Sequence, residues 1–338
     1  MKILLVTPKI SGIGGVAPHT LKLYQLLVRD GHQVKIMSIE NVIHIPIKGL
    51  YNPTFAGSSF FKSLWAKLMG EKFDVVHAHN FPSWPAAEVS NSRLKVLTLH
   101  GIFSIQHRLL HGNFIGSLAG TVEKRWTSKA DTITCISKKC LRYYVNFNKN
   151  TVYVPNAIDT DSLPEEGIRL ADKQVVYIGR LSYEKGADIL VKALDQIDSS
   201  IKVLIIGFGK DDLVKEAQKK HENLKYLGYL PHEQAMKYLK GSDALVIPSR
   251  EEGLPTVLLE AMALKVPIIA SDISEISDVT ENIIKIKCCD EKALAQAVNS
   301  VALFDIRPNV ARAYEEVKDY EWKSVYKKYI EVYEGKFR

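Results

Sequence analysis

Short runs rich in Val and Ile alternate with segments of helical length along the chain, and this alternation constrains the fold more than any other feature. Six runs precede a polar, proline-containing stretch at 155–172, and six follow it. They lie at 2–6, 34–39, 73–77, 95–99, 131–136 and 151–154, and then at 174–178, 202–206, 224–227, 243–247, 266–270 and 283–286. Strands that alternate with helices form parallel sheets covered by helices. The sequence therefore predicts an α/β protein with two Rossmann-like, doubly wound domains, over 1–160 and 170–318, facing each other across a cleft.

The last segment, 319–338, has the spacing of a closing helix. Its apolar residues recur at i, i+3, i+4 and i+7, which places them on one helical face. They are Trp322, Val325, Tyr326, Tyr329, Val332 and Tyr333. We expect this face to pack against the rest of the protein.

Composition narrows the class of protein. With 46% hydrophobic and 25% charged positions among 338 residues, the chain is expected to be soluble and globular. No apolar run approaches the ~20 residues of a transmembrane helix. The opening MKILLVTPK begins like a signal peptide, but Pro8 and Lys9 end its apolar run. The four cysteines form no Cys-x-x-Cys pair, so we expect neither a zinc site nor a disulfide framework, and a cytoplasmic location fits.

Charge is distributed unevenly between the two halves. Residues 1–150 hold 19 Lys and Arg against 7 Asp and Glu, a net charge of +12. The remainder holds 26 against 31, a net charge of −5, and the two values sum to the total of +7. This asymmetry predicts an anionic partner. Nucleic acid is not expected, because no helix-turn-helix, zinc-finger or RNP-like signature is present.

Two glutamates follow the expected strand at 243–247. Glu252 falls in the strand-to-helix loop, and Glu260 falls about one and a half turns into a helix with Pro255 at its first position. Free backbone N–H groups at Thr256, Val257 and Leu258, with the helix dipole, would favour an anion such as a diphosphate.

Carboxylates on either side of such an anion would accept hydrogen bonds from vicinal hydroxyls. This arrangement predicts a ligand with a sugar at each end of a diphosphate, which describes a nucleotide sugar. An alternative remains open, in which Glu252 only complements the helix dipole and Glu260 is an exposed helix residue.

The turn after the strand at 174–178 carries the cations that such a ligand needs. Gly179, Arg180 and Lys185 lie between this strand and the next helix, at the sheet edge expected for Glu252. A guanidinium and an ammonium can hold a diphosphate without a metal ion. Gly207 and Gly209, after the following strand, allow either close approach of a ligand or a plain tight turn.

The first half contains a rival motif and two expected strand ends that carry histidines. The segment from Gly12 to Ala17 matches G-x-G-x-x-A and is followed by Glu40, as in a dinucleotide-binding fingerprint, although 7–11 separate it from the strand. His77 and His79 are either metal ligands or, as we prefer, hydrogen-bonded structural residues. His100, at a strand end, is a candidate to touch the substrate.

Taken together, these segments resemble one family over nearly the whole chain. The order GGV, DVVHAH, LHG, VPNAID, GRLSYEKG, IIGFG, LGYLPHEQAMKYLKGSDALVIPS, EEGLPTVLLEAMA and ASD is similar to the retaining glycosyltransferases of family four, which have the GT-B fold. The resemblance implies that the closing helix returns to the N-terminal domain. It also implies hexose transfer from a nucleotide diphosphate sugar to a glycan or lipid-linked acceptor, with no metal or other cofactor.

The resemblance assigns roles to individual residues. It places Glu252 at the donor hexose, Glu260 at the nucleotide ribose, Arg180 and Lys185 at the diphosphate, and His100 at the sugar. The other donor-binding positions are Gly14, Gly15, Gly179, Gly207, Gly209, Gly253, Leu254, Thr256 and Val257. One departure stands out, because Ser274 and Glu275 occupy positions where the family usually has a Gly-Gly pair.

Three functions follow from these observations. We expect a retaining hexosyltransferase; the alternatives are an NAD-dependent oxidoreductase that uses Gly12–Ala17, and a non-catalytic subunit that binds a nucleotide sugar.

A basic amphipathic segment at 55–72 adds a possible anionic membrane surface as a partner, at the inner face of the membrane, although simple core packing remains open. Its apolar residues are Phe60, Phe61, Leu64, Trp65 and Leu68, and its basic residues are Lys62, Lys67 and Lys72.

Overall fold

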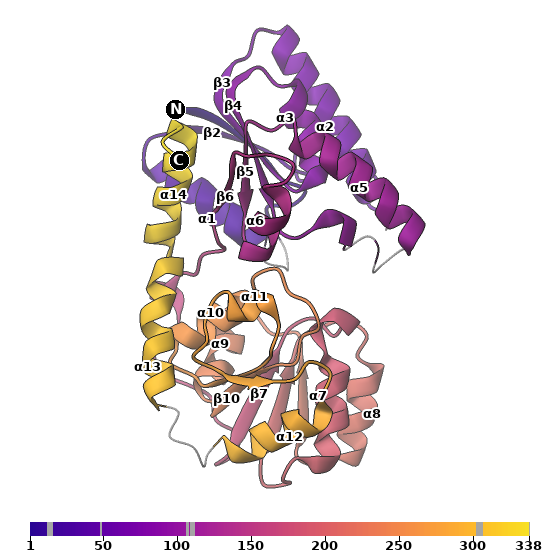
Figure 1. Ribbon diagram of the computed structural model, residues 1–338, viewed down its shortest axis with the longest axis vertical. Helices are drawn as coiled ribbons and strands as arrows, with labels where there is room; N and C mark the ends of the chain where they lie inside the picture. Colours follow the sequence, from indigo (N-terminus) through magenta and orange to yellow (C-terminus); the bar gives the residue numbers. More distant parts are fainter. Residues whose placement is uncertain (12–15, 48, 106–107, 109–111, 302–306, 338) are drawn as a thin grey trace. The chain divides into compact units, whose positions relative to one another are not determined.

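The computed structural model describes residues 1–11, 16–47, 49–105, 108, 112–301 and 307–337. The chain divides into two compact units (Figure 1). Unit 1 comprises Met1–Asn156 and Val325–Arg338, and unit 2 comprises Ala157–Ser324. The sequence placed the end of the first domain at 160 and the start of the second at 170, whereas the division falls between Asn156 and Ala157.

Unit 1 is built on a parallel sheet of six strands in the order β2-β1-β3-β4-β5-β6. The strands are β1 (Lys2–Val6), β2 (Gln33–Met37), β3 (Phe73–His79), β4 (Ser92–Leu99), β5 (Thr132–Cys135) and β6 (Thr151–Tyr153). The central strands are apolar on both faces, as a sheet covered by helices on both sides requires. The order reverses direction beside β1, so the segments that follow β1 and β3 lie at the switch point, where such sheets bind ligands.

The helices of unit 1 connect these strands. They are α1 (Val16–Arg29), α2 (Tyr51–Leu68), η1 (Phe81–Ser83), α3 (Trp84–Val89), α5 (Asn113–Thr127) and α6 (Lys138–Tyr144). Among the described residues, no helix is long and apolar enough to cross a membrane.

Unit 2 repeats the architecture with the strand order β12-β11-β10-β7-β8-β9, again parallel. The strands are β7 (Gln174–Ile178), β8 (Lys202–Ile206), β9 (Leu224–Gly228), β10 (Ala244–Ile247), β11 (Ile268–Ser271) and β12 (Ile284–Ile286). β7 and β10 are neighbours at the centre, so the turns that follow them share one edge of the sheet.

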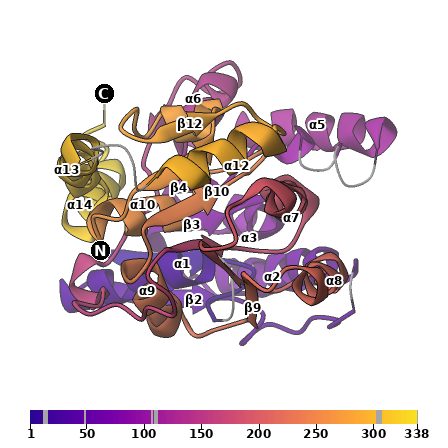
Figure 2. The same cartoon turned by 90° about the horizontal axis from the view of Figure 1, so that it is seen from below.

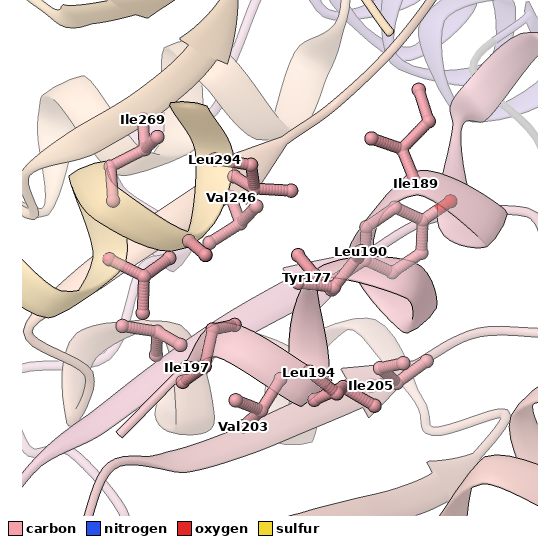
Figure 3. Close-up of a cluster of buried hydrophobic side chains, with 14 of the residues drawn as sticks. Tyr177, Ile189, Leu190, Leu194, Ile197, Val203, Ile205, Val246, Ile269 and Leu294 are labelled. Carbon is pink, nitrogen blue, oxygen red and sulfur yellow. The ribbon is translucent and has the colours of Figure 1, made fainter. Parts of the chain in front are cut away.

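The helices of unit 2 cover both faces of its sheet. They are η2 (Thr160–Ser162), η3 (Tyr183–Lys185), α7 (Ala187–Ala193), η4 (Leu194–Gln196), α8 (Asp212–Lys220), α9 (His232–Lys240), α10 (Thr256–Ala263), α11 (Ser274–Ser277), α12 (Glu291–Ser300), α13 (Arg307–Glu316) and η5 (Val317–Tyr320). α7 and α12 lie side by side over one face (Figures 1 and 2). Figure 3 shows the core beneath them, where Leu190 and Leu294 of these helices meet Val203 and Val246 of the sheet.

All twelve predicted strands are present, with ends within three residues of the expected positions. The alternation of elements was therefore a reliable guide to the Rossmann-like α/β fold. The largest difference is at β4, which begins at Ser92, three residues before the expected start.

The closing helix is shorter than the predicted range of 319–338. η5 occupies the start of that range, and α14 runs over Trp322–Glu334. Its expected apolar face is present, because Val325, Tyr329 and Tyr333 are fully buried. Residues from Val325 onward belong to unit 1, where Tyr329 and Tyr333 pack against histidines of α1 and β3.

Candidate donor-binding site

The loop between β10 and α10 holds Glu252 in a nearly buried position. The side chain of Glu252 is only 4% exposed. One carboxylate oxygen, Oε2, lies 2.5 Å from Nζ of Lys185, which comes from the turn after the neighbouring strand β7. The other, Oε1, accepts a hydrogen bond of 2.7 Å from the hydroxyl of Ser249. The two turns thus meet at one edge of the sheet, as parallel neighbours require.

The two predicted diphosphate cations already have carboxylate partners. The ammonium group of Lys185 pairs with Glu252. Nη2 of Arg180 lies 3.1 Å from Oε1 of Glu184, and the Arg180 side chain is 58% exposed. An exposed pair of this kind contributes at most about 1 kcal/mol, so a phosphate could readily displace Glu184. The half-buried Lys185–Glu252 pair is held more firmly.

Arg250 joins the same two turns and was not singled out from the sequence. Its Nη1 and Nη2 each donate a 2.7 Å hydrogen bond to an oxygen of Asp188, and its guanidinium lies 4.0 Å from the ring centre of Tyr183. The backbone N–H of Arg250 donates to the carbonyl of Glu184 at 2.8 Å. The bidentate hydrogen bonds lower the pKa of Asp188 and raise that of Arg250. The Glu252 loop is therefore fastened to η3 before any ligand binds.

Glycines let the turns of unit 2 pack backbone against backbone. A Cβ at Gly207 would lie 1.8 Å from the carbonyl oxygen of Gly179, and one at Gly209 would lie 2.6 Å from that of Leu181. Gly186 has φ +70, and a Cβ there would lie 2.0 Å from the carbonyl oxygen of Pro248. For Gly207 and Gly209 the sequence left a ligand or a tight turn open, and close packing of turns already accounts for both.

The start of α10 differs from the prediction by one residue. Pro255 is the N-cap rather than the first helical residue, and its carbonyl accepts a 3.2 Å hydrogen bond from the N–H of Leu258. The N–H of Leu258 is therefore not free. Within the described ranges, no partner is present for the N–H groups of Thr256 and Val257, which keeps an anion site at this helix end possible.

The other two predicted positions in this loop differ in exposure. Leu254 is buried with 5% exposure, so its side chain faces the core. Gly253 is half-buried beside Glu252.

Glu260 has a partner that sequence reasoning missed. Its Oε1 lies 2.7 Å from Nε2 of His232, the first residue of α9. The hydrogen bond to Glu260 raises the pKa of His232. A ribose hydroxyl would have to share this carboxylate with the imidazole. The segment LPHEQ was part of the family resemblance, but nothing in its spacing pointed to Glu260.

The departure at 274–275 forms a short helix in place of the expected glycine-rich turn. Glu275 is buried in α11 with 3% exposure, and its Oε2 accepts a 2.8 Å hydrogen bond from the hydroxyl of Ser274. The segment that follows β11 is therefore helical here, where the family resemblance led us to expect a glycine-rich turn.

Unit 1 contributes a cluster of histidines. His77 is hydrogen-bonded at both ring nitrogens, to Tyr333 at 2.7 Å and to Thr98 at 2.5 Å, which confirms a structural role for it. His79 contacts His100, which follows β4 and is half-buried. Burial lowers the pKa of His77 to about 3 and that of His100 to about 4, and it also lowers the pKa of His79. In the part of the chain that the structure describes, no group of three or more potential ligands is placed to hold a metal ion.

Glu40, the acidic residue of the rival dinucleotide-binding fingerprint, is hydrogen-bonded within the protein. Oε1 of Glu40 accepts hydrogen bonds from the N–H groups of Ile10 and Ser11, at 3.3 and 3.2 Å, and ties down the segment after β1. It is therefore engaged by the protein rather than presented to a ribose. Gly12, Gly14 and Gly15 lie outside the described residues.

Two family models match the chain and together extend over 13–315. The model described as Glycosyltransferase Family 4 matches residues 13–162, and the model described as Glycosyl transferases group 1 matches residues 159–315.

Curated relatives agree with these matches. A putative teichuronic acid biosynthesis glycosyltransferase of Bacillus subtilis is 31% identical over 246 residues, which is 67% of this chain and 60% of that protein. A phosphatidyl-myo-inositol mannosyltransferase of Mycobacterium leprae is 26% identical and aligns with 99% of this chain and 96% of its own length.

Solved structures share the fold. A sucrose-phosphate synthase from Thermosynechococcus elongatus matches with a TM-score of 0.82 and 20% identity, covering 100% of this chain and 99% of that one. Anabaena HepE, in complex with UDP and glucose, matches with a TM-score of 0.74 and 17% identity, over 98% of this chain and 99% of that one. With both halves of the sequence matched and two parallel Rossmann-like sheets in place, the chain belongs to the family-four glycosyltransferases and has the GT-B fold.

Proposed function

We propose that this glycosyltransferase moves a hexose from a nucleotide diphosphate sugar to an acceptor hydroxyl and retains the anomeric configuration. The observation that carries the proposal is the nearly buried Glu252 carboxylate, held by Lys185 and Ser249 beside the open N-terminus of α10. A fixed acceptor of hydrogen bonds next to an anion site is the pairing that a sugar diphosphate requires.

The donor would occupy the edge of the unit 2 sheet between the turns that follow β7 and β10. The N–H groups of Thr256 and Val257, the exposed guanidinium of Arg180 and the ammonium of Lys185 would bind the diphosphate and stabilise the charge that develops as it departs. These groups replace the electrostatic role that a metal ion has in other transferases, so we propose that no metal is needed. Anabaena HepE, which was solved with UDP and glucose, supports a nucleoside diphosphate as the ligand class.

The two glutamates would bind opposite ends of the donor. Glu252, fixed at both oxygens, would accept from hydroxyls of the hexose. Glu260 would accept hydrogen bonds from the ribose while its Oε1 keeps the contact with Nε2 of His232. We propose a front-face reaction in which the leaving phosphate helps to remove the proton of the acceptor, because this route gives retention without a covalent enzyme intermediate.

The acceptor would be glycan or lipid-linked and bound at an anionic membrane surface. The exposed face of α2 supports this part of the proposal, since Phe61, Trp65 and Leu68 lie at i, i+4 and i+7 and are 69, 66 and 72% exposed. Lys62 and Lys67 are exposed on the same helix. Exposed apolar side chains with interleaved lysines are typical of helices that lie in a membrane interface.

The opposite face of α2 packs against the unit, so core packing accounts for part of the pattern. Phe55, Ser59 and Ser63 are buried, while Phe60 and Leu64 are half-buried. The mannosyltransferase of Mycobacterium leprae, whose name specifies a phosphatidyl-inositol acceptor, is consistent with a lipid-linked substrate.

A ligand screen tests the donor class. Thermal unfolding is measured with UDP-, GDP-, ADP- and dTDP-sugars and with NAD, at concentrations far above any ordinary dissociation constant. A ligand at a hundred times its dissociation constant stabilises the folded state by about 2.7 kcal/mol. We expect stabilisation by one nucleotide sugar and by its nucleoside diphosphate, and no effect of NAD. Stabilisation by NAD alone would contradict the proposal.

A further inference from the structure

Four histidines of unit 1 pack together where the first sheet ends. His77 and His79 lie two residues apart on β3, and therefore on one face of the sheet, while His100 follows β4 and His19 lies on α1. Ring centres are 4.3 Å apart for His77 and His79, 5.6 Å for His79 and His100, and 6.2 Å for His19 and His100. Burial holds these rings in the neutral form, so each has one N–H donor and one acceptor nitrogen.

The contact between His79 and His100 requires one proton between them. Nδ1 of His79 lies 3.3 Å from Nε2 of His100. Either His79 donates through Nδ1–H, or His100 donates through Nε2–H. Because a neutral imidazole carries one proton, each choice also fixes what the other nitrogen of each ring presents.

The second nitrogen of His79 distinguishes the two arrangements. Nε2 of His79 is fully buried and has no hydrogen-bond partner in the described part of the chain. If His100 were the donor, the proton of His79 would lie on this nitrogen as a buried N–H without an acceptor. Orphaned buried N–H groups are rarer in proteins than acceptors that lack a donor. The arrangement with a bare lone pair at Nε2 is therefore favoured.

We infer that His79 donates from Nδ1 to His100 and thereby holds His100 in its Nδ1–H form, which makes His100 a hydrogen-bond donor to the substrate rather than a general base. Among the described residues, none hydrogen-bonds to Nδ1 of His100, and in this arrangement its N–H would be presented to a ligand. It would suit a sugar hydroxyl oxygen or a phosphate oxygen. His79 is a positioning residue in this account, because it acts through His100.

The backbone of His100 is held as well. Its N–H donates to Oδ1 of Asn80 at 3.2 Å, and the N–H of Asn80 donates to the carbonyl of Thr98 at 2.9 Å. Asn80 has φ 62 and ψ 165, a conformation that non-glycine residues rarely adopt. Strain of this kind persists only where the surroundings fix it, as expected beside a site that orients His100.

Nuclear magnetic resonance of the intact protein, labelled with ¹⁵N-histidine, tests the inference directly. Long-range ¹H–¹⁵N correlations distinguish Nδ1–H from Nε2–H imidazoles, and His100→Gln identifies the signal of His100. We expect the Nδ1–H form for His100 in the unmodified protein at neutral pH. His44→Gln, at a histidine outside the cluster, should leave that signal unchanged. An Nε2–H form of His100 would overturn the inference.

Two substitutions of His79 test the positioning role. His79→Asn keeps an amide N–H near the place of Nδ1, whereas His79→Leu removes the donor. We expect His79→Leu to mix the two forms of His100 and to lower kcat about tenfold to a hundredfold with little change in the donor KM. His79→Asn should restore most of both. Unchanged His100 signals and kcat in His79→Leu, or equal losses in the two variants, would contradict the role.

The inference rests on the proposed function only for the statement that His100 touches substrate. Failure of the proposed function and failure of the inference about His100 can therefore be distinguished. If no nucleotide sugar binds or reacts, the proposed function fails, and the tautomer spectrum is unaffected by that result. If transfer occurs but His100 is in the Nε2–H form, only the inference fails.

Discussion

The two units share one architecture but hold the residues at their strand ends in different ways. In unit 2 the turns after β7 and β10 are joined by charged pairs, Lys185 with Glu252 and Arg250 with Asp188. In unit 1 the corresponding end of the sheet is lined by neutral imidazoles, hydrogen-bonded to one another and to tyrosines of α14.

This difference indicates which part of a substrate each unit can bind. Charged pairs can exchange partners with phosphate oxygens, so the edge of the unit 2 sheet suits the anionic diphosphate of a donor. Neutral imidazoles offer directed hydrogen bonds without a formal charge and suit hydroxyl groups. The net charges contrast with this local pattern, because residues 1–150 carry +12 and the remainder −5. The surplus positive charge of the first half therefore needs another partner, for which we propose an anionic membrane.

The largest expected effect is at Glu252. Glu252→Ala should lower kcat by about a hundredfold to a thousandfold, because it removes a fixed group that we propose binds the reacting sugar, and because it leaves Lys185 half-buried without its carboxylate. Glu260→Ala is the matched control, because Glu260 lies on α10, directly after the loop that holds Glu252. This variant should mainly raise the donor KM. Steady-state kinetics with the donor found in the screen check both. Near-normal kcat in Glu252→Ala would remove the distinction between the two carboxylates.

Loss of the Arg250 contacts with Asp188 and Tyr183 should give the next largest effect. It tests whether these contacts hold the turns of unit 2 together before a ligand binds. Arg250→Lys keeps the charge but loses the bidentate pair with Asp188 and the stacking on Tyr183, so we expect a loss of about 2 kcal/mol in the free energy of unfolding. Lys219→Ala, at an exposed ion pair, should change stability by less than about 1 kcal/mol. Urea unfolding measures both values. Equal losses of stability in the two variants would show that the Arg250 contacts contribute no more than an exposed ion pair.

The charge contrast predicts that membrane binding belongs to unit 1. Replacement of Lys62, Lys67 and Lys72 by Gln should weaken binding to anionic vesicles about tenfold or more, since each lysine near an anionic leaflet contributes ~1 kcal/mol. Lys219, Lys220 and Lys225 of unit 2, replaced in the same way, form the control with the same change in net charge.

Co-sedimentation with vesicles at about 0.15 M salt, where the Debye length is about 8 Å, measures this binding. The vesicles are prepared with and without anionic lipid. A protein that stays in the supernatant with both preparations, or two triple variants that bind equally, would refute the membrane surface on α2.

The smallest effect concerns pH and the pair between Glu260 and His232. The pKa of His232 is raised by this hydrogen bond, so the pair stabilises the fold at acidic pH and the contribution is lost as pH rises through the raised pKa. His232 is 59% exposed, and solvent screening limits the effect to less than about 1 kcal/mol. The difference in stability between the unmodified protein and His232→Gln should therefore be larger at pH 5 than at pH 9. A difference that grows with pH would contradict the assignment.

The sequence predicted the parts of this protein that depend on periodicity and strand order. Alternating apolar runs located every strand, and the rule that parallel neighbours end at the same edge brought Lys185 to Glu252. Local spacing could not reveal the partners of Arg250 or Glu260, because Asp188 and His232 reach them through tertiary packing.

The glycines illustrate the same limit. Gly207 and Gly209 were correctly placed after β8, but only the structure shows that carbonyl groups of the preceding turn exclude any side chain there. The ion pair between Lys185 and Glu252 likewise became visible only in the structure, although the sequence placed both residues at one edge of the sheet.

The most direct test of the account is the stereochemistry of transfer. The intact protein is incubated with the stabilising nucleotide sugar, the native or a lipid-linked acceptor and excess EDTA, and proton NMR follows the anomeric signal of the first product. The account predicts turnover in EDTA, with a product of the same anomeric configuration as the donor. An inverted product, or activity that EDTA abolishes and Mg²⁺ or Mn²⁺ restores, would contradict it.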